Sequence, residues 1–298
     1  MAFSASDAAF EGFRVVRRHP LALVFWMLAY LFIYAATFAL AGPAVINMGA
    51  QAEAIGATDP ANLDAFEPLL QSYMALLAVV MPVALVLGAV LYAAVARAVL
   101  RPHENAFGYM RLGMDEVRVV VVSVALAVMM LAAIAVAGFA VGLVGGFGGA
   151  VGLPALWLVA VLLGVALAGA IIWLAVRLSL AVPITVAERR IAIFDSFAMT
   201  RGQFWPLLGM ALLAGVLSLV VGMLSMIVTL PLRMAMGGLD LMQQLQGQDM
   251  AQMLQAAWPS LLAMGVANSI VAALQLAVVY APFSAAYREL APRRPDAA

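Results

Sequence analysis

Charged residues are so sparse along this chain that they leave five long uncharged segments, of 34, 29, 58, 31 and 38 residues. A helix rising about 1.5 Å per residue needs roughly 20 residues to cross a hydrocarbon core of about 30 Å. Four of the segments therefore predict one membrane span each, and the longest predicts two. We expect an all-α, polytopic membrane protein whose six transmembrane helices form a single domain. The expected spans lie near residues 21–42, 70–97, 119–142, 154–177, 206–230 and 258–282, with a tail at 283–298.

The longest uncharged segment must turn once, and its glycines indicate where. Residues 144–154 read VGGFGGAVGLP, which is the densest run of helix-weakening residues in that segment. This run predicts a tight hairpin between the third and fourth spans. It is not typical of a phosphate-binding loop, because no Gly-Lys-Ser/Thr follows it and the chain contains no lysine. The spacing of Gly138, Gly142 and Gly146 also favours close packing of the third span against another helix.

The positions of the arginines predict the orientation of the chain. All fifteen basic residues are arginines, and fourteen of them fall on one side of a six-span arrangement. Because cytoplasmic connections carry an excess of basic residues, we expect a bacterial inner-membrane protein with both termini in the cytoplasm. The opposite connections, 43–69 and 231–257, are acidic, with Arg233 as their one base. Five or seven spans would scatter the arginines over both faces.

The first apolar segment has an alternative interpretation as a cleaved signal peptide. Arg17 and Arg18 precede it, and it ends in the small-residue sequence Ala39-Leu40-Ala41. The apolar run from Leu21 onward exceeds the roughly 7–15 residues of a typical signal core. We therefore expect the segment to be retained as the first span.

The composition excludes several classes of partner and site but does not identify a function. Hydrophobic residues make up 66% of the chain and charged residues 10%, and the mean hydropathy is +1.09. A formal net charge of zero provides no long-range positive field for nucleic acid, so we expect no such partner. The absence of cysteine excludes disulfides and thiolate metal sites. His19 and His103 lack partners at metal-ligand spacing, so we expect no metal and no cofactor.

The expected spans contain no residues typical of an ion-coupling site or of a catalytic cluster. No expected span has a carboxylate, lysine or histidine in its interior, where ion-coupled transporters commonly place one. No Ser-His-Asp set or carboxylate pair is brought together by sequence spacing. We therefore expect that the protein is not an enzyme.

A short aromatic and charged element recurs before each odd-numbered span. It reads FEGF at residues 10–13 followed by Arg17, FGYMR at residues 107–111, and FDSF at residues 194–197 followed by Arg201. The recurrence predicts a pseudo-threefold repeat of an interfacial helix plus a transmembrane hairpin.

Helical spacing suggests what this repeated element does. In the first copy Asp7, Glu11, Arg14 and Arg18 share one helix face, and aromatic residues occupy another. Such a helix is expected to lie in the membrane surface, where Arg17, Arg111 and Arg201 can meet anionic lipid head groups. The competing interpretation, which we favour, is that these elements simply anchor the starts of the spans.

One stretch of the sequence resembles a known family. Residues 177–188 read RLSLAVPITVAE, residues 194–205 read FDSFAMTRGQFW, and residues 287–290 read YREL. This pattern is similar to the membrane domain found beside some bacterial glycerophosphoryl diester phosphodiesterases and in related stand-alone multi-pass proteins. The resemblance implies a six-span helical domain that accompanies a catalytic domain. Because the spans occupy nearly all of this chain, we do not expect phosphodiesterase activity.

Arg177, Pro183 and Glu188 are the most distinctive residues of this stretch. The proline is expected to bend the chain after the fourth span. An Arg177–Glu188 pair folded across the bend would then fasten the helix end, since charge at the edge of the hydrocarbon is costly unless paired. Alternatively, Arg177, Glu188 and Arg201 bind a head group or another ligand.

Polar residues inside the last two spans form two stripes. Ser218, Ser225 and Thr229 share a face of the fifth span, and Asn268 and Gln275 share a face of the sixth. The favoured interpretation is hydrogen bonding between the two helices, and the alternative is a polar pathway for a solute. We accordingly expect a non-catalytic role in membrane organisation, lipid association or binding of a membrane-protein partner or second copy. A transporter or channel for a neutral or lipid-like solute is the alternative.

Overall fold

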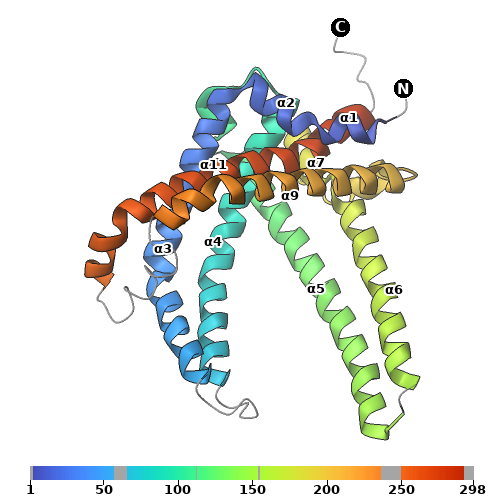
Figure 1. Cartoon of the computed structure of the whole chain (residues 1–298). Coiled ribbons are helices and arrows are strands. Elements are labelled where there is room, and N and C mark those ends of the chain that lie inside the picture. The colour runs from blue at the N-terminus through green and yellow to red at the C-terminus, as the bar shows by residue number, and fades with distance from the viewer. Residues whose placement is uncertain (1–2, 57–65, 112, 154, 236–249, 292–298) are drawn as a thin grey trace.

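The computed structural model of the chain describes residues 3–56, 66–111, 113–153, 155–235 and 250–291 (Figure 1). Within these residues all regular structure is helical and no strand is present. The helices are α1 (Ala5–Ala9), α2 (Glu11–Arg18), α3 (Pro20–Gly56), α4 (Glu67–Leu100), the 3₁₀ turn η2 (Ala106–Tyr109), α5 (Met114–Val151), α6 (Ala155–Leu178), α7 (Ala181–Glu188), α8 (Asp195–Met199), α9 (Phe204–Ala235) and α11 (Met250–Leu290).

Six of these helices, α3, α4, α5, α6, α9 and α11, are long and apolar enough to cross a membrane. This confirms the expectation of a multi-pass helical protein, and the expected spans coincide with these helices apart from residue 154, which lies outside the described residues. The helices are longer than the roughly 20 residues that a hydrocarbon core requires. α5 has 38 residues and α11 has 41. The expected tail at 283–298 therefore begins inside α11, which continues to Leu290.

The hairpin between α5 and α6 turns later than the glycines predict. α5 continues through the glycine run to Val151, nine residues beyond the expected end of the span at residue 142. Gly152 then takes a left-handed φ of 65°, and the Leu153 N–H donates to the Gly148 carbonyl at 3.0 Å. Glycine weakens helices mainly in water, whereas a lipid-embedded backbone must satisfy its hydrogen bonds internally. Most of the run therefore remains helical.

The glycine spacing on α5 does not mediate the close packing that it predicted. A Cβ added at Gly138, Gly142 or Gly146 would meet no atom of the described residues within 4 Å. A Cβ at Gly148, by contrast, would lie 2.7 Å from Leu156 Cβ, at the turn of the hairpin. The close approach of α5 to α6 thus uses a neighbouring face of the helix, which sequence spacing alone does not distinguish.

The three transmembrane hairpins are not equivalent in space. The α3–α4 and α5–α6 hairpins extend away from one end of the molecule. Helices α9 and α11 run side by side across that end, at a wide angle to the two hairpins (Figure 1). The elements that precede them also differ, being two helices (α1 and α2), a 3₁₀ turn (η2) and a five-residue helix (α8). The structure therefore does not confirm the predicted pseudo-threefold repeat.

The segments rich in arginine gather at one end of the molecule, which we call the arginine end. It comprises α2, the connection from α4 to α5, α7, α8 and the end of α11 (Figure 1). The packed core lies here as well, where Trp26 of α3, Ile184 of α7 and Met210 of α9 are fully buried. Farther out little is buried, since only 6–28% of the most apolar window of each span is enclosed. The buried core is therefore concentrated at the arginine end.

The two amino-terminal helices are held against α11 by close backbone contact and by charge. A Cβ added at Gly12 would lie only 2.5 Å from Val278 Cα, so the backbones of α2 and α11 touch. The buried Glu11 carboxylate lies 3.3 Å from Arg14, 3.8 Å from Arg18 and 3.3 Å from Arg288. Residues predicted to share one helix face do therefore interact, although the chain divides into α1 and α2 at Phe10.

Asp7 adds a further contact to this attachment. A hydrogen bond from Arg14 holds the pKa of the Asp7 carboxyl below its usual range. Because the folded state favours the ionised carboxylate, this contact is present at neutral pH and is lost as the pH falls through the lowered pKa.

Candidate functional site

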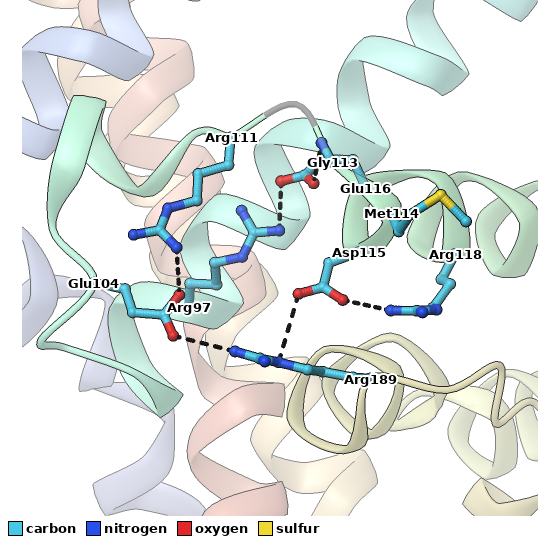
Figure 2. A pocket seen from close by; sticks show the side chains of 9 residues that line it. All are labelled: Arg97, Glu104, Arg111, Gly113, Met114, Asp115, Glu116, Arg118 and Arg189. Carbon is cyan, nitrogen blue, oxygen red and sulfur yellow. Dashed lines mark hydrogen bonds and ion pairs between the residues drawn. The ribbon is translucent and has the colours of Figure 1, made fainter.

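A pocket of about 490 Å³ opens at the arginine end, where α4, the connection after it, α5 and the end of α7 meet (Figure 2). Its lining is strongly charged. The lining residues are Arg97, Glu104, Arg111, Gly113, Met114, Asp115, Glu116, Arg118 and Arg189.

A buried ion pair between Arg97 and Glu116 forms the inner wall of the pocket. The two residues are only 1% and 4% exposed, and the pair joins the end of α4 to the first turn of α5. Arg97 also donates to the Tyr109 carbonyl at 2.9 Å, and Glu116 accepts from the Gly113 N–H at 2.9 Å. The second contact caps α5, because a carboxylate in the first helical turn accepts from the backbone N–H of the N-cap residue. These shared bonds offset the cost of burying two charges.

A left-handed turn directs the chain from α4 into the pocket. Phe107, Gly108 and Tyr109 have φ values of 48°, 64° and 66°, which is strained for the two aromatic residues. The Trp26 indole holds the turn by donating to the Gly108 carbonyl at 2.8 Å. The Tyr109 hydroxyl donates to the Pro102 carbonyl at 3.1 Å. This network fixes the direction in which the chain leaves the turn towards Arg111.

Glu104 is shared by three arginines on the outer side of the pocket. Its carboxylate oxygens lie 3.0 Å from Arg111, 3.5 Å from Arg189 and 4.0 Å from Arg101. These arginines belong to three different parts of the chain, and Arg189 is 85 residues away in sequence. The carboxylate therefore joins the connection after α4 to the end of α7.

Asp115, in the first turn of α5, is shared in the same way. It lies 2.7 Å from Arg118, 3.6 Å from Arg101 and 3.9 Å from Arg189. Four arginines thus surround the two carboxylates Glu104 and Asp115, which leaves two positive charges uncompensated within this cluster. Figure 2 shows the two carboxylates and three of these arginines, Arg111, Arg118 and Arg189, converging on the pocket from separate elements.

The end of α7 is positioned by a backbone cap. Arg101 donates to the Val186 carbonyl at 2.6 Å and to the Ala187 carbonyl at 3.3 Å, which satisfies carbonyls of the last helical turn. Arg189 follows with a left-handed φ of 55°, so the chain reverses immediately and its guanidinium reaches Glu104 and Asp115. Arg101 thereby places Arg189 at the pocket.

The residues predicted to bind lipid are distributed over the arginine end and do not form one site. Arg111 lines the pocket. The side chains of Arg17 and Arg201 are exposed and form no ion pair or hydrogen bond with any residue that the structure describes. Arg177 lies near Arg201, because it donates to the Thr200 hydroxyl at 3.4 Å. Glu188 accepts from Arg190 at 2.7 Å.

The predicted Arg177–Glu188 pair is wrong. Arg177 instead donates to the Phe197 carbonyl at 3.2 Å and lies 5.3 Å from the Trp173 ring centroid. The chain bends before Pro183, which occupies the first turn of α7, where a missing N–H costs nothing. Helix α7 then carries Glu188 away from Arg177 by about two turns. Proline at this position starts a helix and does not fold the charges together.

The two polar stripes meet at one point of the α9–α11 contact. The Gln275 side-chain amide donates to the Ser218 carbonyl at 3.1 Å, and the Thr229 hydroxyl donates back to the Ser225 carbonyl at 2.8 Å. Asn268 is half-buried on α11. Neither the arginine pocket nor the apolar groove between α5 and α6 includes a stripe residue. The observed bonds are those of helix packing.

Sequence reasoning missed most of the pocket although one signal for it was present. Arg97 closes a long apolar segment, and a charge at such a position requires a partner. Asp115 and Glu116 were the nearest carboxylates beginning the next span. Arg189 had no comparable signal, because its place depends on how α7 packs.

Comparison with models of protein families, with curated proteins and with solved structures finds no match for this chain. Its function must therefore be argued from the geometry of the arginine end.

Proposed function

We propose that this protein is a non-catalytic, multi-pass protein of the bacterial inner membrane that associates with anionic lipid head groups through its arginine end. The observation that carries the proposal is the charged cluster at the pocket, in which four arginines share only two carboxylates and three of the four arginines line the pocket. Lipid phosphates are the anions that a membrane presents in abundance at this level, and arginine pairs with phosphate through parallel N–H bonds.

Exposed aromatic residues support a position of the arginine end at the membrane surface. Phe107, Phe194 and Trp205 are 73%, 68% and 76% exposed, and each lies within a few residues of an arginine. Aromatic rings prefer the boundary between head groups and acyl chains, and neighbouring arginines extend to the phosphates. The same arrangement favours a cytoplasmic location of this end, because basic residues accumulate there.

The extensive apolar surface supports a role in association and not in catalysis. Only 6–28% of the most apolar window of each span is buried, and the open glycine face of α5 is part of the remaining surface. Membrane lipids, a membrane-protein partner or a second copy of the chain would cover it. The resemblance to the membrane domain beside glycerophosphoryl diester phosphodiesterases agrees with such a role, because that domain accompanies the catalyst in its family.

Removing the exposed and pocket arginines is expected to weaken retention of anionic lipid. The variant Arg17→Gln/Arg111→Gln/Arg201→Gln should lose about fivefold in lipid affinity per arginine, since each base near the surface contributes about 1 kcal/mol. The measurement is mass spectrometry of lipid retained after extraction from vesicles of equal phosphatidylglycerol and phosphatidylcholine. Arg233→Gln, in the last turn of α9, is the control. An unchanged lipid ratio in the triple variant would remove the proposal.

Reporter insertions test the proposed orientation. A reporter between α9 and α11 should lie on the same side as one between α3 and α4, and a carboxy-terminal reporter should be cytoplasmic. The first insertion is the more demanding one, because α9 and α11 run at a wide angle to the other hairpins (Figure 1). A cytoplasmic signal there would reduce the number of spans, and a periplasmic carboxy terminus would reverse the orientation.

A further inference from the structure

We infer that the arginine pocket is a selective site for a phosphomonoester, bound through Arg111, Arg118 and Arg189. This inference rests on the proposed lipid association and specifies the chemical class of the head group. It depends on the charge of the cluster, on free hydrogen-bond donors and on the surroundings of the pocket.

The charge of the cluster matches a dianion. Glu104 and Asp115 contribute two negative charges against four arginines, while Arg97 and Glu116 compensate each other on the inner wall. A phosphomonoester carries a charge of about −1.5 to −2 at pH 7. A phosphodiester carries a single charge, so it would leave the cluster positively charged. A head group with an ammonium would bring a further positive charge to the arginines.

The arginines have unused donors directed at the pocket. A guanidinium offers five N–H donors, and that of Arg111 has one bond, to Glu104, among the residues that the structure describes. The side chains of Arg111, Arg118 and Arg189 remain 48%, 31% and 60% exposed, so solvent or a ligand can reach them. Figure 2 shows the three guanidinium groups approaching from different directions. An anion between them would receive hydrogen bonds that the two carboxylates do not saturate.

The start of α5 adds to the positive potential. The pocket includes Gly113, Met114 and Asp115, which form the N-cap and the first turn of a 38-residue helix. The N-terminus of a helix carries a partial positive charge that favours phosphate. A cavity of about 490 Å³ holds a phosphate together with a glycerol-sized group.

Apolar side chains beside the pocket favour a lipid as the source of the phosphate. Met114 and Val117 of the first α5 turns are 67% and 53% exposed. They place an apolar surface directly beside the charged pocket. A phosphomonoester lipid has the matching arrangement, with a charged head group beside apolar chains. A water-soluble phosphomonoester would share the phosphate contacts but gain nothing from this surface.

The test compares four ligands with the full-length protein in neutral detergent. The ligands are dioctanoyl phosphatidate, dioctanoyl phosphatidylglycerol, glycerol phosphate and inorganic phosphate, each measured by calorimetry or native mass spectrometry. We expect phosphatidate to bind at least tenfold more tightly than phosphatidylglycerol, because it makes additional charge-assisted bonds. If glycerol phosphate binds as tightly as phosphatidate, the pocket binds phosphomonoesters but its lipid source is wrong.

Two double variants separate the pocket from general electrostatics. Arg118→Gln/Arg189→Gln should lower the ratio of the phosphatidate affinity to the phosphatidylglycerol affinity at least tenfold. Arg17→Gln/Arg201→Gln removes the same charge outside the pocket, so it should weaken both lipids alike and change that ratio less than threefold. Arg189→Lys keeps the charge and should retain part of the affinity if the pocket variant folds poorly. Equal losses in the two double variants, or equal affinity for both lipids, would overturn the inference while leaving general lipid association intact. Failure of every anionic lipid to bind would overturn both.

Discussion

Glu116→Gln is expected to lower the free energy of unfolding by about 3–5 kcal/mol, the range typical of breaking a buried ion pair. The change leaves the Arg97 guanidinium 1% exposed beside an uncharged amide. It also weakens the cap of α5, because a glutamine amide oxygen is a weaker acceptor than a carboxylate for the Gly113 N–H. The measurement is an unfolding titration with SDS in mixed micelles.

Replacing both members of this pair separates its contribution from the cost of a lone charge. Arg97→Met/Glu116→Leu should recover much of the stability lost in Glu116→Gln, because well-packed apolar residues often replace a buried pair with little loss. Arg190→Gln is the matched control, since Arg190 pairs with Glu188 but is 55% exposed. That control should cost less than about 1 kcal/mol. If Glu116→Gln costs no more than the control, the pair does not hold α4 and α5 together.

Gly12→Ala is expected to detach the amino-terminal helices from α11. The new Cβ would lie 2.5 Å from Val278 Cα and 2.6 Å from the Ala277 carbonyl oxygen, both of which are backbone atoms. Backbone cannot move aside as a flexible side chain can, so α2 must shift and the Glu11–Arg288 contact must lengthen. We expect a loss of about 1–3 kcal/mol, as for other overpacked sites, and faster proteolysis between α2 and α3.

Gly88→Ala in α4 is the matched control for Gly12→Ala. A Cβ at Gly88 meets no atom of the described residues within 4 Å, and alanine is the better helix former by up to about 1 kcal/mol. The control should therefore be as stable as the parent or more stable. Equal protease sensitivity and equal stability in the two variants would show that α2 does not depend on the close contact at Gly12.

Features that depend on the chain alone were predicted correctly, whereas features that depend on solvent or on a neighbouring helix were not. Counting uncharged residues located all six apolar helices, because apolar length is a property of the chain itself. Glycine content misplaced the α5–α6 turn, because a backbone without competing water stays helical. Glycine spacing likewise selected a face of α5 that meets no neighbour in the described residues. Spacing defines a face but not the direction from which another helix approaches.

Only part of the candidate pocket could be predicted from the sequence. Its residues from Arg97 to Arg118 lie on the end of α4, the start of α5 and the connection between them, so their proximity follows from a short connection. Arg189 joins them only because Arg101 caps α7 and the chain reverses at a left-handed residue. The packing of the segments around α7 likewise decides that Arg177 bonds to Phe197 and Thr200 and not to Glu188.

By itself the sequence determined the helical class, the number of apolar helices and the separation of arginines from the opposite connections. These follow from the fixed thickness of a bilayer and from the cost of placing charge inside it, both of which act along one dimension of the chain. Only the tertiary structure decided which arginine meets which carboxylate and that four arginines share two carboxylates around one pocket. Ion pairing requires contact within about 4 Å. Such contacts depend on the angles and registers between helices, which the lengths of the apolar segments do not specify.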